Sequence, residues 1–221
     1  TYWLVEPVAG NDVYLTIDLD VQLAAEKALA ENVASVDGAE SGSVVACDPD
    51  TGEVIAMASY PTYDLTYFNR DYNDLSSAAG SPLLNRSLSA YAPGSTFKVG
   101  VALAALETGA IDSSTVMHTE GIYKRMKCSH YALSGGHTYC CGDINVCGAL
   151  EKSCNYFFGV LGDDLGTDVI AEYAKLLGLG EATGIEIGES EGRRATNEEL
   201  AFMAAIGQSD NLFTPLQVTQ Y

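Results

Sequence analysis

The stretch Ala92-Pro93-Gly94-Ser95-Thr96-Phe97-Lys98 places a serine and a lysine three residues apart, just before an apolar segment. The Pro-Gly pair marks a turn, and the apolar run over residues 99–106 predicts a helix after it. Residues i and i+3 are neighbours on a helix, so Ser95 and Lys98 share one face. A partly desolvated lysine can take the proton of a hydroxyl, which makes Ser95 a candidate nucleophile and Lys98 its base. The alternative for such a pair is a solvated helix face.

A second polar element, Ser153-Cys154-Asn155, precedes another apolar run. A hydroxyl such as that of Ser153 can relay a proton to a leaving amine, and the Asn155 carboxamide can hold both the lysine and a substrate amide. The simpler interpretation is that Asn155 caps a helix, since Asn and Ser are common helix caps. We expect Cys154, in the middle position, to point into the helix packing.

Together these two elements resemble S-x-x-K and S-D-N, two of the three motifs of penicillin-binding proteins and serine β-lactamases, with cysteine in place of aspartate. The third motif, K-T-G, is absent, and no lysine follows Lys175. Further blocks appear in the family's order, and the chain resembles the transpeptidase domain of class B penicillin-binding proteins over nearly its whole length. These blocks are residues 11–18 with Gln22, residues 48–59, residues 84–86, residues 206–208 and residues 214–217.

The resemblance implies an α+β fold, an incomplete penicillin-binding protein or serine β-lactamase-like transpeptidase domain in which an antiparallel sheet packs with a helical cluster. It implies a D,D-transpeptidase that cross-links peptidoglycan stem peptides ending in D-Ala-D-Ala through a serine acyl-enzyme and is acylated by β-lactams. Ser95 would be the nucleophile, Lys98 the base, Ser153 the proton relay and Asn155 the positioning residue. The chemistry would need no cofactor. A glycosyltransferase is the expected partner of the full-length protein.

The resemblance also predicts the domain organisation. We expect residues 1–10 to be a linker from a missing N-terminal region, and residues 11–221 to be a transpeptidase domain without its C-terminal part. The full-length protein would sit at the extracytoplasmic face of the bacterial plasma membrane through an N-terminal anchor, and this piece would be soluble. Because the strand with the third motif supplies an oxyanion donor, we expect the chain as given to be inactive or nearly so. A class D β-lactamase or β-lactam sensor domain, and a catalytically dead scaffold, remain alternatives.

The composition limits the partners. With 30 acidic and 11 basic residues the net charge is −19, which argues against nucleic acid and anionic lipid as partners. No apolar run approaches the roughly 18 to 20 residues that span a bilayer.

The hydrophobic pattern predicts strands and helices in alternation. Strands are expected at residues 13–17 and 183–187, and a hairpin is expected from residues 42–47 and 53–59. Residues 60–82 are expected to be irregular. Helices are expected over residues 19–33, 97–107, 144–151, 155–163, 168–178 and 197–206.

Five of the six cysteines fall between residues 128 and 154, with His130 and His137 among them. Structural zinc, one or two disulfides, and free thiols are three interpretations that the spacing leaves open. Some class B enzymes that this chain resembles carry zinc beside the active site. For a zinc site the predicted ligands are Cys128, His137, Cys141 and Cys147, and the metal would hold Ser153 and Asn155 in position.

Overall fold

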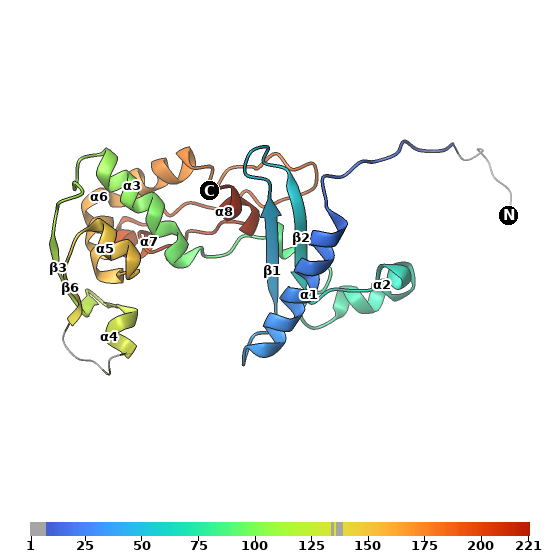
Figure 1. Cartoon of the computed structure of the whole chain (residues 1–221), viewed down its shortest axis with the longest axis horizontal. Helices are drawn as coiled ribbons and strands as arrows, with labels where there is room; N and C mark the ends of the chain where they lie inside the picture. The colour runs from blue at the N-terminus through green and yellow to red at the C-terminus, as the bar shows by residue number, and fades with distance from the viewer. Residues whose placement is uncertain (1–7, 134, 136–138) are drawn as a thin grey trace.

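The computed structural model describes residues 8–133, 135 and 139–221. Two groups of elements lie side by side (Figure 1): helices α3, α5, α6 and α7 form one, and the hairpin β1–β2 with α1 and α2 forms the other. The elements in chain order are α1 (Leu19–Ser35), β1 (Gly42–Cys47), β2 (Val54–Tyr60), η1 (Leu65–Tyr67), α2 (Phe68–Ser77), η2 (Arg86–Leu88), η3 (Gly94–Phe97), α3 (Lys98–Glu107), β3 (Met117–Glu120), β4 (Ile122–Tyr123), β5 (Met126–Lys127), α4 (Ser129–Leu133), β6 (Tyr139–Ile144), α5 (Val146–Glu151), α6 (Asn155–Leu176), η4 (Glu198–Leu200), α7 (Ala201–Ala204) and α8 (Pro215–Gln220).

The predicted hairpin is present as β1 and β2, which pair antiparallel with Gly42 opposite Tyr60. The Asp48 carboxylate shapes its turn by accepting hydrogen bonds from the backbone N–H groups of Asp50 and Thr51, at 2.8 and 3.0 Å. Helix α1 packs on this hairpin through a small cluster that includes Leu29. Two further two-stranded sheets, β3–β6 and β4–β5, complete the strand pairing of the described residues. The expected α+β arrangement is confirmed, although its antiparallel strands form three small sheets.

The main core lies among the helices. Helix α6 carries Phe157, Phe158 and Leu161, all fully buried, and Gly166 interrupts it with φ 76°. This kink separates the two helices that the sequence predicted over residues 155–163 and 168–178. At Gly162 an added Cβ would lie 2.5 Å from the carbonyl oxygen of Ala201, so only glycine permits this approach of α6 to α7.

Three sequence-based expectations are wrong. Residues 13–17 form no strand, and their side chains are mostly exposed. Their contact with β2 includes a side-chain hydrogen bond, in which the Thr16 hydroxyl donates to the Val54 carbonyl at 2.5 Å. Residues 183–187 form no strand either, because the Thr183 N–H donates to the Glu189 carboxylate at 2.8 Å instead of to a neighbouring strand. Residues 60–82 were expected to be irregular but contain α2, none of whose residues is buried.

Among the described residues, no helix combines the length and apolar character needed to cross a bilayer. Residues 1–7 of the expected linker lie outside the described part of the chain.

Candidate functional site

Ser95 lies in the short 3₁₀ turn η3, directly before α3. Its side chain is exposed, whereas Phe97, two residues later, is 1% exposed and packs against Phe213 with ring centroids 5.7 Å apart. Phe97 therefore anchors the turn in the core and leaves Ser95 facing outward. As the second residue of the turn, Ser95 carries one of the backbone N–H groups that a helix start leaves without an internal partner.

The turn is also held from the C-terminal part of the chain. The Gly94 N–H donates to the Gly207 carbonyl at 2.9 Å, and Tyr91 and Phe213 exchange backbone hydrogen bonds at 2.9 and 2.8 Å. Two segments more than 100 residues apart in sequence thus fix the backbone on which Ser95 sits.

Lys98 begins α3 and is only 2% exposed. Its Nζ lies 2.8 Å from the Ser153 carbonyl oxygen, 3.0 Å from the Ser153 Oγ and 2.6 Å from the Asn155 Oδ1. Among the described residues, the hydrogen bond that joins Lys98 to Ser95 runs from the backbone N–H of Lys98 to the Ser95 carbonyl, and the Lys98 amine bonds to Ser153 and Asn155. The structure therefore brings together Lys98, Ser153 and Asn155, with Ser95 on the adjoining turn.

Burial lowers the pKa of Lys98 from 10.5 to about 8, because the desolvated ammonium loses its hydration. The thiols of Cys154 and Cys141 act in the opposite direction. With this pKa, about a tenth of the molecules hold the neutral, basic lysine at pH 7, far more than at the ordinary value.

Ser153 joins α5 to α6 with φ 48°, a left-handed conformation that is uncommon outside glycine. The next residue, Cys154, is fully buried and donates its N–H to the Ala149 carbonyl at 2.8 Å, so it points into the helix packing as predicted. This sharp connection turns both the carbonyl and the hydroxyl of Ser153 toward Lys98.

Asn155 is the first residue of α6, and Cys154 occupies the cap position. The interpretation of Asn155 as a helix cap is therefore wrong. Its Nδ2 donates to the Lys127 carbonyl at 3.2 Å, which leaves Oδ1 to accept from Lys98.

The hydrogen bonds around Lys98 suit a neutral amine. The Ser153 carbonyl and the Asn155 Oδ1 can only accept hydrogen bonds, and together they use the two N–H donors of an uncharged amine. The remaining lone pair is then available to a hydroxyl, so the arrangement can remove a proton from a serine.

The predicted zinc ligands do not assemble as expected. Cys128 and Cys141 lie together, but the third donor of their group is His130, with the three ligand atoms within 4.8 Å of one another. Cys147 is exposed and is not part of this group, and His137 lies outside the described residues. The sequence signal for His130 was its position two residues after Cys128.

Cys128 is disulfide-bonded, so its sulfur is not a thiolate that could bind a metal. Cys47, Cys141, Cys147 and Cys154 are not disulfide-bonded. The described donors therefore do not fit a four-ligand zinc site. The disulfide interpretation applies to Cys128, and the thiol interpretation applies to the other four described cysteines.

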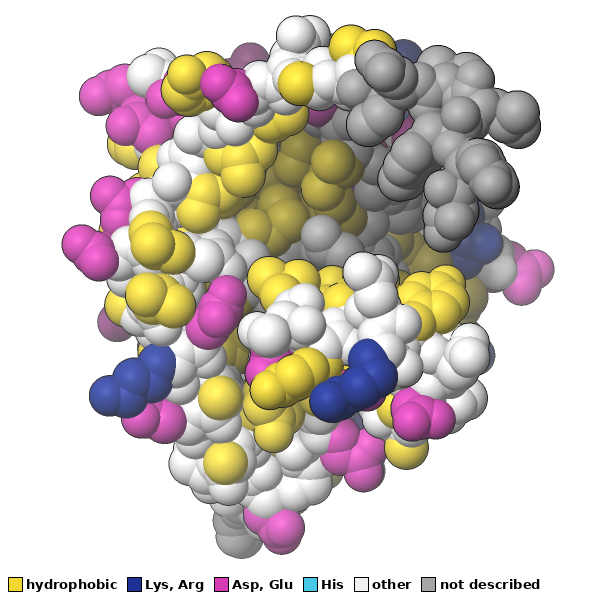
Figure 2. All heavy atoms as spheres, turned by 90° about the vertical axis from the view of Figure 1, so that its right-hand side faces the viewer, with side chains coloured by type: hydrophobic (Ala, Val, Ile, Leu, Met, Phe, Trp, Pro, Cys, Tyr) yellow, Lys and Arg dark blue, Asp and Glu magenta, His cyan; other side chains and the backbone are white. Residues whose placement is uncertain are grey.

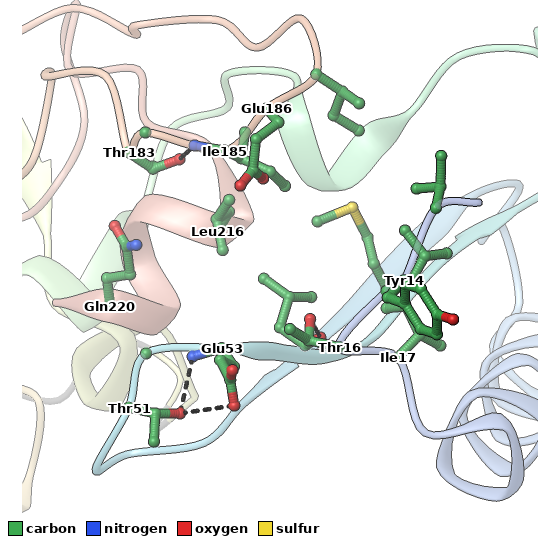
Figure 3. A pocket seen from close by; sticks show the side chains of 17 residues that line it. Tyr14, Thr16, Ile17, Thr51, Glu53, Thr183, Ile185, Glu186, Leu216 and Gln220 are labelled. Carbon is green, nitrogen blue, oxygen red and sulfur yellow. Dashed lines mark hydrogen bonds between the residues drawn. The ribbon is translucent and has the colours of Figure 1, made fainter. Parts of the chain in front are cut away.

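A cavity of about 770 Å³ is separate from this constellation. It lies between residues 13–17, the β1–β2 turn, residues 183–187 and α8, with Leu216 and Gln220 on one wall (Figure 3). Seen from the side of α1 and α2, the molecule is hollowed and hydrophobic side chains line the hollow (Figure 2). None of Ser95, Lys98, Ser153 and Asn155 lines the cavity.

Comparison with known proteins extends over most of the chain. A model described as the penicillin binding protein transpeptidase domain matches residues 42–221. The peptidoglycan D,D-transpeptidase MrdA of Escherichia coli K12 is 35% identical over 201 residues, which cover 88% of this chain and 30% of that protein.

Two solved structures share the fold. A chain from work on the structural coordination of polymerization and crosslinking by a peptidoglycan synthase complex superposes with a TM-score of 0.82 at 35% identity, covering 97% of this chain and 42% of that chain. The penicillin G acyl-enzyme complex of penicillin-binding protein A from M. tuberculosis gives a TM-score of 0.72 at 30% identity, covering 92% of this chain and 49% of that chain. This chain thus spans less than half the length of each of these relatives.

Proposed function

The chain belongs to the family of penicillin-binding protein transpeptidase domains, and from this membership we propose that it supplies the acyl-transfer site of a peptidoglycan D,D-transpeptidase. The observation that carries the proposal is the buried Lys98, whose Nζ contacts both Ser153 and Asn155 next to the turn that bears Ser95. The relatives named as D,D-transpeptidases support the same reaction. The family's serine acyl transfer uses no cofactor.

In the first half-reaction, Ser95 Oγ attacks the carbonyl carbon of the penultimate D-alanine of a stem peptide, and its proton passes to the Lys98 amine. The Ser95 N–H, at the start of η3, is placed to stabilise the oxyanion that forms. The C–N bond to the terminal D-alanine then breaks. The leaving amine takes a proton through the Ser153 hydroxyl, which contacts Lys98 at 3.0 Å.

In the second half-reaction, an amine from a neighbouring stem attacks the ester on Ser95 and forms the cross-link, with Lys98 and Ser153 moving the protons in reverse. The Lys98 amine bonds to Ser153 and Asn155 rather than to the Ser95 hydroxyl, and catalytic contacts of this kind often tighten only when the substrate binds. β-Lactams would be attacked by the same serine, as the penicillin G acyl-enzyme of the mycobacterial relative supports.

Residues 11–221 would belong to one transpeptidase unit, since the family model and the fold comparison together extend over nearly all of this range. The full-length protein would work at the extracytoplasmic face of the plasma membrane, held there by an N-terminal anchor, because peptidoglycan stem peptides are cross-linked outside that membrane. A glycosyltransferase is the proposed partner, supported by the relative from a complex that coordinates polymerization with crosslinking.

Two alternative functions are less well supported. A class D β-lactamase or β-lactam sensor domain shares the Ser95 motif, but the family model and the curated relatives are transpeptidases. A catalytically dead scaffold has no need for a buried, desolvated lysine, which costs folding free energy.

Mass spectrometry with penicillin G tests the proposal. The protein that carries this chain is expected to gain one penicilloyl group, which peptide mapping places on Ser95, and Ser95→Ala is expected to gain none. Folded wild-type protein that stays unmodified, or an adduct that persists in Ser95→Ala, would show the proposal to be wrong. Hydrolytic turnover of the antibiotic would favour the β-lactamase alternative.

A further inference from the structure

The hydroxyl of Tyr221 lies at the junction between the turn that bears Ser95 and the helix that begins with Lys98. The Gly100 N–H donates to this hydroxyl at 2.7 Å, and the hydroxyl donates to the Thr96 carbonyl at 3.2 Å. In a regular α-helix the N–H of residue 100 bonds directly to the carbonyl of residue 96. The phenol thus bridges a donor and an acceptor that a regular helix would join without it.

The bridge has a consequence for the two site residues. Thr96 lies between Ser95 and Lys98, and the Lys98 N–H is itself bonded to the Ser95 carbonyl in the tighter 3₁₀ pattern. A hydroxyl between residues 96 and 100 therefore sets how far the turn η3 stands from the first turn of α3. From this geometry we propose that Tyr221 is a positioning residue, which fixes the spacing between the nucleophile and its base.

Tyr221 is itself firmly placed. It follows α8, whose start is closed by a capping box in which Thr214 and Gln217 bond each other's backbone N–H groups. Gln217 is 1% exposed, and its side chain also donates to the Glu181 and Glu191 carbonyls at 2.6 and 2.9 Å. Displacement of α8 would break this buried network, so α8 acts as a rigid support for the residue that makes the bridge.

The space around the bridge is tight at residue 100. A Cβ on Gly100 would lie 3.1 Å from Leu177 Cδ1 and 3.4 Å from the Tyr221 hydroxyl. Burial raises the pKa of Tyr221, so the phenol keeps the proton that it donates to Thr96.

The test compares Tyr221→Phe with Tyr123→Phe, since each variant loses one partly buried phenol hydroxyl. The Tyr123 hydroxyl donates to the Asp163 carboxylate at 2.6 Å, and Asp163 belongs to α6 rather than to η3 or α3. Stopped-flow measurements with a chromogenic β-lactam separate the dissociation constant of the first complex from the rate constant of acylation.

This inference rests on the proposed function. We expect Tyr221→Phe to lower the acylation rate constant on the order of 10- to 100-fold, because small misplacements of reacting groups have effects of this size. The dissociation constant should stay unchanged, and Tyr123→Phe should react like the wild type. Equal rate constants for Tyr221→Phe and the wild type, or an equal loss in both variants that follows their unfolding temperatures, would overturn the positioning role.

Hydrogen–deuterium exchange provides a readout that does not depend on activity. Removal of the bridge should speed amide exchange in peptides that contain Gly100, and Tyr123→Phe should leave these peptides unchanged. If the wild type were not acylated at all, the proposed function would fail and exchange alone would decide: faster exchange at Gly100 supports the bridge, and unchanged exchange overturns it.

Discussion

The Nζ of Lys98 donates to the Oδ1 of Asn155 at 2.6 Å, in a site where Lys98 is 2% exposed. The amide cannot turn its donor toward the lysine, because its Nδ2 is engaged by the Lys127 carbonyl. Asn155 thus gives the lysine a fixed neutral acceptor, which orients the amine without adding the negative charge that would hold it protonated.

The first prediction concerns the pH dependence of acylation. Lys98 has a pKa of about 8 and must be neutral to accept the Ser95 proton. The acylation rate by a β-lactam should therefore rise with pH, reach half its maximum near pH 8 and level off above it. Rapid-quench mass spectrometry over pH 6–10 measures this profile, and a rate that falls through this range would contradict the role of Lys98 as base.

The same lowered pKa predicts how stability depends on pH. Between pH 8 and about 10.5 the unfolded chain holds a proton on Lys98 that the folded chain has released. The free energy of unfolding should therefore gain a contribution that rises with pH across this window. Urea denaturation of the wild type and of Lys98→Met isolates this contribution. Only the wild type should show the increase in the free energy of unfolding that comes from Lys98.

Substitution of Asn155 by Asp tests whether Lys98 needs an uncharged hydrogen-bond acceptor. A carboxylate next to the Lys98 ammonium favours the charged lysine and should raise its pKa by about 1–3 units. The pH of half-maximal acylation should rise correspondingly, and the rate at pH 7 should fall about tenfold or more.

Asn32→Asp is the matched control for this change, since Asn32 is exposed on α1 and its side chain donates to the Ala28 carbonyl of the same helix. It adds the same charge far from Lys98 and should leave the profile in place. If the pH profile of acylation were the same in Asn155→Asp as in the wild type, the contact between Asn155 and Lys98 would not control the pKa of the lysine.

Two substitutions of Ser153 distinguish the role of its hydroxyl from the strain in its backbone. Ser153→Ala and Ser153→Gly both remove the proposed proton relay and should slow acylation to a similar extent. Only glycine relieves the left-handed backbone at φ 48°, so Ser153→Gly should be more stable than Ser153→Ala by about 1 kcal/mol. Urea denaturation measures this difference, and equal stabilities would argue against strain at residue 153.

The cysteines can be assigned by differential alkylation. In denaturant without reductant, iodoacetamide should modify Cys47, Cys141, Cys147 and Cys154, whereas Cys128 should react only after reduction. In the native protein the exposed Cys147 should react quickly and the fully buried Cys154 slowly. Alkylation of Cys128 without reductant, together with a zinc mass in native spectra, would support the zinc interpretation instead.

Much of the site was predictable from the sequence, because its residues lie in short motifs with strong local constraints. The spacing of Ser95 and Lys98 follows from a turn and a helix start, and the pairing of Lys98 with Asn155 follows from the family's motifs. The Tyr221 bridge was not predictable, since it joins residues more than 100 positions apart whose contact depends on how α8 packs.

The errors in the fold have a similar cause. Residues 13–17 alternate like a strand, but alternation is a local pattern and a strand also needs a partner backbone along its length. Helix α2 was missed although Phe68, Tyr72 and Leu75 recur at helical spacing, because the rest of the helix is polar and none of its residues is buried.

The final prediction concerns Gly207, which holds the Ser95 turn from the far end of the chain. A Cβ at this position, where φ is 72°, would lie 2.0 Å from the Gly94 carbonyl oxygen. Gly207→Ala must therefore push Gly94 away, and we expect it to lower the free energy of unfolding by about 2 kcal/mol or more and to slow acylation.

Gly109→Ala separates this contact from the cost of the backbone conformation. Gly109 has nearly the same φ, 73°, but an added Cβ there meets no atom within 4 Å. It should lose about 1 kcal/mol, the cost of a left-handed alanine, with acylation unchanged. Because the two variants differ only in the neighbour that the new methyl group meets, the difference between their unfolding free energies and between their acylation rates measures the Gly94–Gly207 contact. Equal values would show that this contact does not position Ser95.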